Sequence, residues 1–142
     1  MTTVLVTGGC GFIASHFIRL LLQETSYRVI NLDAITYAGN MENLADVLSH
    51  PNHIFYRGDI TDSQYVSTIF EAEKPSAVVN FAAESHVDRS IIDSSPFLKT
   101  NVLGTHVLLE VARQHKTSRF LQVSTDEVYG DAEGEAPRHE GD

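Results

Sequence analysis

Short apolar runs rich in β-branched residues alternate along this chain with longer stretches whose apolar residues recur at helical spacing. The runs predicted to be strands are residues 4–7, 28–32, 54–56, 77–81 and 120–123. The stretches predicted to be helices are residues 12–23, 41–48, 63–73, with Ser63 as the expected cap, and 96–113. Such alternation is typical of a parallel sheet with right-handed crossovers and helices on both faces. The sequence therefore predicts an α/β protein with a doubly wound parallel sheet, truncated after about the fifth strand.

The last dozen residues differ from the rest of the chain. Residues 131–142 contain Gly134, Pro137 and Gly141, together with five acidic residues and no apolar residue larger than alanine. We expect residues 1–130 to form one compact domain and residues 131–142 to form a polar loop that should lead to further chain.

Composition excludes several classes of partner. The 19 acidic and 10 basic side chains give a formal net charge of −9, which would repel a phosphate backbone and argues against nucleic acid as a partner. The single cysteine favours a reducing compartment, and no basic leader or apolar run of about 18 residues is present. We expect a cytoplasmic protein without a membrane partner. The histidines show no metal-ligand spacing, so no metal site is predicted.

A glycine-rich turn joins the first predicted strand to the first predicted helix. Gly8, Gly11 and Ala14 follow a G-x-x-G-x-x-A spacing, in which glycine permits a tight turn and the close approach of a pyrophosphate to the backbone. The alternative is a purely structural glycine turn that binds no ligand. Cys10 sits in the same turn near a helix N-terminus, which tends to lower a thiol pKa, but we interpret it as a small side chain filling a tight turn.

Acidic residues follow the second and third predicted strands. Asp33, about 20 residues beyond the glycines, is where the adenosine ribose hydroxyls of a dinucleotide would be held, and its charge favours NAD over NADP. Asp59 fits two roles equally well, an acceptor for the adenine amino group or a cap of the following turn. These features together predict a Rossmann-like, NAD-binding domain.

Longer motifs give the chain a family resemblance. The stretches that carry it are residues 7–13, 32–40, 58–60, 81–90, 100–105 and 123–130. The chain resembles the extended short-chain dehydrogenase/reductases and, within them, the dTDP-glucose 4,6-dehydratases. The resemblance implies cofactor contacts at Phe12, Ile13, Asp33, Thr36, Asp59, Ile60, Ala82, Ala83, Ser85 and Thr100, in addition to Gly8 and Gly11. Ser85 is also implied as a contact of the nucleotide-sugar substrate.

The Thr125-Asp126-Glu127 motif is the feature that indicates dehydration rather than simple epimerisation. Elimination of water needs a base for one proton and an acid for the departing hydroxyl, and two neighbouring carboxyls can supply both. By resemblance, Glu127 is the base at C5, Asp126 is the acid toward the C6 hydroxyl, and Thr125 binds the sugar near C4. The alternative is a solvated pair of loop acids. Likewise, the polar residues from Glu84 to Arg89 either line a pocket or form a surface salt-bridge cluster.

Part of the family pattern has no counterpart here. The family activates its C4 hydroxyl with a Tyr followed four residues later by Lys, and none of the five tyrosines has Lys at that spacing. The C-terminal sugar-nucleotide domain and the second helix of the family's homodimer interface are also missing. We therefore expect the chain alone not to turn over, and its 96–113 helix to expose an apolar face.

Three other interpretations remain open at this point. The chain could be a stand-alone NAD-binding or sensing module, although such a module would not need Thr125-Asp126-Glu127. It could be a subunit completed by a separate chain that carries the Tyr–Lys pair. The substrate nucleotide is also open between dTDP-, UDP- and CDP-glucose, because the contacts to the nucleotide belong to the missing domain.

Overall fold

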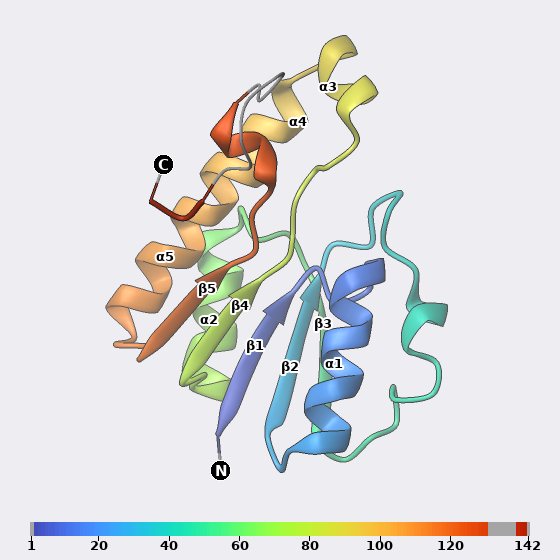
Figure 1. Ribbon diagram of the computed structural model, residues 1–142. Helices are drawn as coiled ribbons and strands as arrows, with labels where there is room; N and C mark the ends of the chain where they lie inside the picture. The colour runs from blue at the N-terminus through green and yellow to red at the C-terminus, as the bar shows by residue number, and fades with distance from the viewer. Residues whose placement is uncertain (1, 131–138, 142) are drawn as a thin grey trace.

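A computed structural model describes residues 2–130 and 139–141, and its centre is a parallel sheet of five strands (Figure 1). The strands are β1 (Thr3–Thr7), β2 (Arg28–Asp33), β3 (His53–Arg57), β4 (Ala77–Asn80) and β5 (Arg119–Gln122). Their order across the sheet is β3-β2-β1-β4-β5, and every neighbouring pair is parallel. The predicted doubly wound, Rossmann-like α/β fold is therefore confirmed.

Helices cover both faces of the sheet. The α-helices are α1 (Phe12–Glu24), α2 (Ser63–Glu73), α3 (Val87–Ile92), α4 (Ser95–Phe97) and α5 (Thr105–Gln114). In Figure 1, α1 lies in front of the sheet and α2 and α5 lie behind it. Strand residues alternate between the two layers: Val4 and Val6 pack with α1, and Leu5 packs with α2 and α5. β1 and β4 are buried almost throughout and read as nearly continuous apolar runs, whereas β5 at the edge of the sheet is largely exposed.

Three local features differ from the sequence-based expectation. The 63–73 helix is capped by Asp62 rather than Ser63, because the Asp62 carboxylate accepts a hydrogen bond from the backbone N–H of Tyr65 at 3.0 Å. The expected 41–48 helix is a short 3₁₀ helix, Met41–Leu44. The α3 helix was not expected, since its segment was interpreted only as a polar loop.

The helix expected over residues 96–113 has a composite structure. It begins as α4, widens into a π-helical segment at Leu98–Gly104, and continues as α5. Among residues 2–130 and 139–141, no helix is long and apolar enough to cross a membrane. The predicted polar loop 131–142 lies, apart from residues 139–141, outside the described part of the chain.

Candidate cofactor and active site

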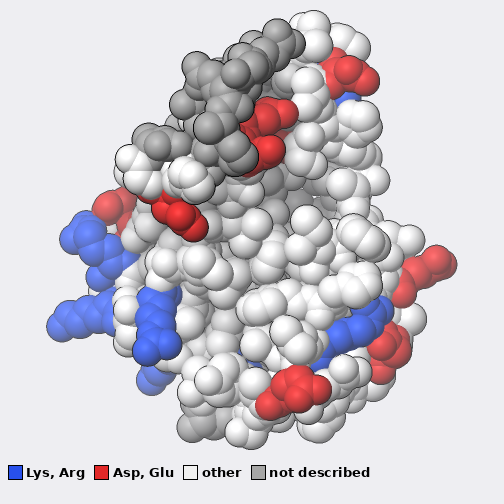
Figure 2. All heavy atoms as spheres, viewed as in Figure 1, with Lys and Arg blue, Asp and Glu red and all other residues white. Residues whose placement is uncertain are grey.

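A groove of about 870 Å³ crosses the carboxyl ends of the strands. All twelve residues predicted to contact the cofactor line it, as do Thr125 and Glu127. On the face shown in Figure 2, most Lys and Arg side chains lie toward the opposite end of the strands. An anionic ligand in this groove would therefore depend largely on backbone N–H groups and not on side-chain cations.

The glycine turn forms the floor of the groove. Gly8 has φ +68°, and a Cβ there would lie 2.8 Å from the backbone nitrogen of Ala82. The turn is closed by hydrogen bonds from Gly8 N to Leu32 O (2.9 Å) and from Gly11 N to Gly8 O (3.0 Å). Only glycine combines this backbone conformation with the close approach of the segment after β4.

The start of α1 is the most anion-attracting feature of the groove. Gly11 occupies the N-cap position and provides no side-chain cap, which leaves first-turn N–H groups of α1 without a capping partner. Phe12 and Ile13 are 78% and 65% exposed, so nothing in the described structure covers this helix end. Free N–H groups and the helix dipole together suit a pyrophosphate.

Asp33, at the end of β2, is buried and is tied to the glycine turn. Its Oδ2 accepts a hydrogen bond from Cys10 N at 2.9 Å, and its Oδ1 accepts one from Ile35 N at 2.7 Å. Each carboxylate oxygen keeps a second lone pair for a ligand hydroxyl. Asp33 therefore shapes the turn as well as facing the groove, a double role that the sequence did not reveal.

The Cys10 side chain has no exposed surface and packs in the core under α1. Burial, with a smaller contribution from the nearby Asp33 charge, raises the pKa of its thiol to about 11. This effect outweighs the lowering expected from a helix N-terminus. The structure therefore supports a packing role for Cys10 and not a reactive one.

Asp59 forms the turn cap that was one of its two predicted roles. Its Oδ1 accepts hydrogen bonds from the backbone N–H and the hydroxyl of Thr61, at 2.9 Å and 2.8 Å. Its Oδ2 lies 3.5 Å from Lys99 Nζ. Partial burial opposes ionisation, but the hydrogen bonds from Thr61 and the Lys99 charge lower the pKa of Asp59 below its usual value. Asp59 also lines the groove, so its role as a turn cap does not exclude its other predicted role, as an acceptor for the adenine amino group.

A polar network, buried at Thr7 and Asn80 and exposed at Gln122, joins the floor of the groove to its far wall. The Thr7 hydroxyl, at the end of β1, donates to Asn80 Oδ1 at the end of β4. Asn80 Nδ2 donates in turn to Gln122 Oε1 of β5 at 2.8 Å. The network links the carboxyl ends of β1, β4 and β5 to one another. Thr125 lies in the segment that follows β5. Sequence reasoning missed it because its members are far apart along the chain.

The Thr125-Asp126-Glu127 motif lies at this far wall. A 3₁₀ helix, Asp126–Tyr129, follows Thr125, whose hydroxyl accepts a hydrogen bond from Glu127 N at 3.3 Å. Thr125 and Glu127 line the groove, whereas Asp126 is not among its described lining residues. All three side chains are exposed. Of the two acidic residues of the motif, Glu127 therefore belongs to the groove lining.

The polar residues from Glu84 to Arg89 form no ion pair with one another in the described part of the chain. Glu84 lines the groove, and its backbone is held by Asn101 from the π-helical segment, another residue that sequence reasoning missed. The surface salt-bridge cluster, one of the two alternatives for these residues, is therefore not formed by them. Nor do the described residues contain a group of three His, Cys, Asp or Glu side chains placed to hold a metal ion.

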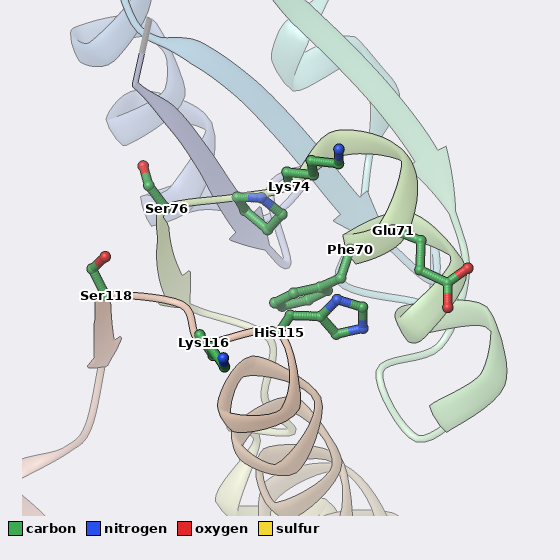
Figure 3. Close-up of a pocket in the computed structure, with 8 residues that line it drawn as sticks. Phe70, Glu71, Lys74, Ser76, His115, Lys116 and Ser118 are labelled. Atoms are coloured by element: carbon green, nitrogen blue, oxygen red, sulfur yellow. The ribbon is translucent and has the colours of Figure 1, made fainter.

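A second hollow, of about 510 Å³, lies at the opposite end of the molecule, where α2 and α5 end (Figure 3). Its wall includes Lys74, Ser76 and His115. The Ser76 hydroxyl already donates to Thr3 O, and the His115 ring packs against Phe70. Ligands of open parallel sheets bind at the carboxyl ends of the strands, so we assign the cofactor role to the first groove.

The glycine turn, the free helix N-terminus and Asp33 around one groove define a Rossmann-type dinucleotide-binding protein. The chain belongs to the GDP-mannose 4,6 dehydratase family, whose model matches residues 5–142. The family match agrees with the resemblance that the sequence motifs indicated.

Individual relatives agree with this assignment. The chain is 55% identical to the low-salt glycan biosynthesis protein Agl12 of Haloferax volcanii, over 90% of this chain and 41% of that protein. It is 50% identical to the dTDP-glucose 4,6-dehydratase of Xanthomonas campestris, over 92% of this chain and 39% of that enzyme. The structure of the Streptomyces venezuelae dTDP-glucose 4,6-dehydratase with NAD and TYD bound matches with a TM-score of 0.87 and 49% identity, over 92% of this chain and 41% of that one. The chain thus spans about two fifths of the length of these proteins.

Proposed function

We propose that this chain is the NAD-binding part of a nucleotide-sugar 4,6-dehydratase that converts dTDP-glucose to its 4-keto-6-deoxy product. The observation that carries the proposal is the single groove that joins the twelve predicted cofactor residues to Thr125 and Glu127. The relatives named dTDP-glucose 4,6-dehydratase, and the solved structure with NAD, support the same substrate and cofactor.

The groove fits a dinucleotide by its own geometry. The first turn of α1 offers backbone N–H groups to the pyrophosphate, and the missing side chains of Gly8 and Gly11 leave room for it. Asp33 would accept the ribose hydroxyls and repel a 2′-phosphate, and Asp59 would lie near the adenine. Thr36, Ile60, Ala82, Ala83, Ser85 and Thr100 complete the lining. When bound, NAD supplies the hydride acceptor for C4 and the hydride that is later returned to C6.

The residues of this chain would carry the proton transfers of the elimination. Glu127, a residue of the groove lining, would take the C5 proton during elimination and return a proton to C5 when the hydride is delivered to C6. Thr125 would hold the sugar oxygen at C4. Asp126 protonates the departing C6 hydroxyl, which requires its carboxyl to turn from its 3.3 Å contact with the Thr125 hydroxyl toward the substrate. The C5 proton becomes acidic only after oxidation at C4. Elimination therefore depends on a group that activates the C4 hydroxyl for oxidation. In the family this group is a Tyr followed four residues later by Lys, and the 142 residues contain no such pair.

A hybrid enzyme tests the proposal directly. Residues 5–142 of this chain would replace the matching segment of the Xanthomonas campestris enzyme, and formation of the 4-keto-6-deoxy product would be measured. We expect an active hybrid, loss of activity in its Glu127→Gln form with NAD binding retained, and no product from the 142-residue chain alone. A hybrid that folds and binds NAD but forms no product would overturn the proposed reaction.

A calorimetric titration of the 142-residue chain with NAD and then NADP tests the cofactor part separately. We expect saturable binding with a preference for NAD, because the Asp33 carboxylate opposes a 2′-phosphate. Equal binding of the two dinucleotides would show that Asp33 does not contact the ribose.

A further inference from the structure

Three residues from separate segments meet next to the groove, which one of them, Glu84, lines. The Tyr37 hydroxyl, in the turn after β2, donates a hydrogen bond to Glu84 Oε2, after β4, at 2.9 Å. The guanidinium carbon of Arg89, on α3, lies 3.9 Å from the centroid of the Tyr37 ring. A cation at this distance from an aromatic face is attracted to it.

The sheet order fixes what this contact spans. β2 and β4 are the two neighbours of β1, so a link between the segments that follow them crosses the carboxyl end of β1. The glycine turn lies at that end. Residues beside the link line the groove on both sides, Thr36 and Ala38 on one and Ser85 on the other. The link therefore crosses the place where the pyrophosphate would lie.

Glu84 is a firm anchor for the link. Its backbone N–H donates to Asn101 Oδ1 at 2.8 Å, and its carbonyl accepts from Asn101 Nδ2 at 2.9 Å. Both bonds hold one peptide segment against the π-helical turn. Tyr37, by contrast, lies on an exposed turn and is 51% exposed, so it is the end of the link that can move.

We propose that Tyr37, Glu84 and Arg89 form a clasp over the bound dinucleotide that slows its release. This inference rests on the proposed function, since it requires NAD in the groove. A dehydratase that takes a hydride from its substrate and returns it in the same cycle gains from retaining the cofactor. The clasp opens by breaking the Tyr37–Glu84 bond and moving the turn after β2 away from Glu84.

Release kinetics test the clasp. NADH bound to the purified chain is chased with excess NAD, and the loss of its fluorescence is followed by stopped flow. Tyr37→Phe removes the hydroxyl but keeps the ring, and Arg89→Met removes the cation but keeps the length. We expect release to be about 2- to 12-fold faster for Tyr37→Phe and about 2- to 5-fold faster for Arg89→Met, with association rates little changed.

Tyr27→Phe is the matched control, because Tyr27 is a half-exposed tyrosine that precedes β2 at the opposite end of the sheet. Release rates in both clasp variants equal to that of this control would overturn the clasp while leaving NAD binding intact. If the unchanged chain binds no NADH, the proposed function itself fails and the clasp fails with it.

A second measurement tests the contact without any cofactor. Partial burial and the hydrogen bond to Glu84 raise the pKa of Tyr37, so the ultraviolet titration of the unchanged chain and of Tyr37→Phe should differ by one phenol that ionises above the ordinary range. If that phenol ionises in the ordinary range, the contact is absent and the clasp is refuted.

Discussion

Replacement of Gly8 by alanine would separate the folding role of the glycine turn from its binding role. At φ +68°, an alanine adopts a left-handed conformation that costs about 1–2 kcal/mol. Its Cβ would also lie 2.8 Å from the nitrogen and 2.9 Å from the Cα of Ala82. These are backbone atoms, and the nitrogen donates to the Thr7 hydroxyl at 3.3 Å, so the segment after β4 must shift. Such overpacking costs about 1–3 kcal/mol. We expect a total loss of about 2–5 kcal/mol in the free energy of unfolding.

Gly11→Ala is the matched variant. Its backbone has φ −75°, and an added Cβ would meet only Gly8 O, at 3.1 Å. We expect Gly11→Ala to lose less than about 1 kcal/mol of stability but much of its NAD affinity, because Gly11 lines the groove at the start of α1, where we expect the pyrophosphate to lie. Urea unfolding followed by circular dichroism measures the first quantity, and calorimetry with NAD measures the second. Equal unfolding midpoints for Gly8→Ala and the unchanged chain would refute this reasoning.

Three further predictions concern acidic groups and the thiol. Asp33→Asn should weaken NAD binding at least about 10-fold, because a charge-assisted bond is worth about 1.5–3 kcal/mol, and should weaken NADP binding less; an equal loss for both dinucleotides in calorimetry would contradict the role of Asp33. The thiol pKa of Cys10 is about 11 in the folded chain against an ordinary 9.0, so the unfolded thiol ionises first and stability should fall as pH rises from about 9 to 11. In urea titrations, the fall in the free energy of unfolding between pH 9 and 11 should be smaller by about 2–3 kcal/mol in Cys10→Ala. The same fall in both proteins would contradict the raised pKa of Cys10. Asp62→Ala should cost about 0.5–2 kcal/mol in thermal or urea unfolding, while Asp62→Asn, which keeps an acceptor, should cost less; equal effects would rule out the cap.

The strands were predictable because a buried parallel strand has a strong local signature. Val4, Leu5 and Val6 alternate between two cores, so the whole run is apolar and its ends are marked by polar residues. The short helix α3 lacked such a signature, since none of its residues is buried. The exact cap of α2 was equally hard to place, because Asp62 and Ser63 are adjacent and both suit an N-cap.

Individual residues of the groove were predictable only where a sequence motif determines the local backbone conformation. Gly8, Gly11 and Asp33 follow from the spacing of a strand–turn–helix unit, and the structure brings them together. The bonds that hold Asp33 to Cys10, or Tyr37 to Glu84, join residues 23 and 47 positions apart. Such contacts depend on how the sheet is ordered, so no local pattern reports them. The orientation of Asp126 relative to Glu127 depends on one 3₁₀ turn, which the motif alone does not specify.

The π-helical segment between α4 and α5 acts as a phase step within one continuous helix. Each residue of an α-helix turns the chain by about 100°, so a widened turn rotates everything before it relative to everything after it. After the step, Val107, Leu108 and Val111 are buried in the core beside α2. Within it, Thr100 lines the groove and Asn101 holds Glu84. A single helix thereby contributes both to the core and to the groove. Deletion of one residue from this segment should therefore rotate the core residues of α5 relative to the groove residues that precede them.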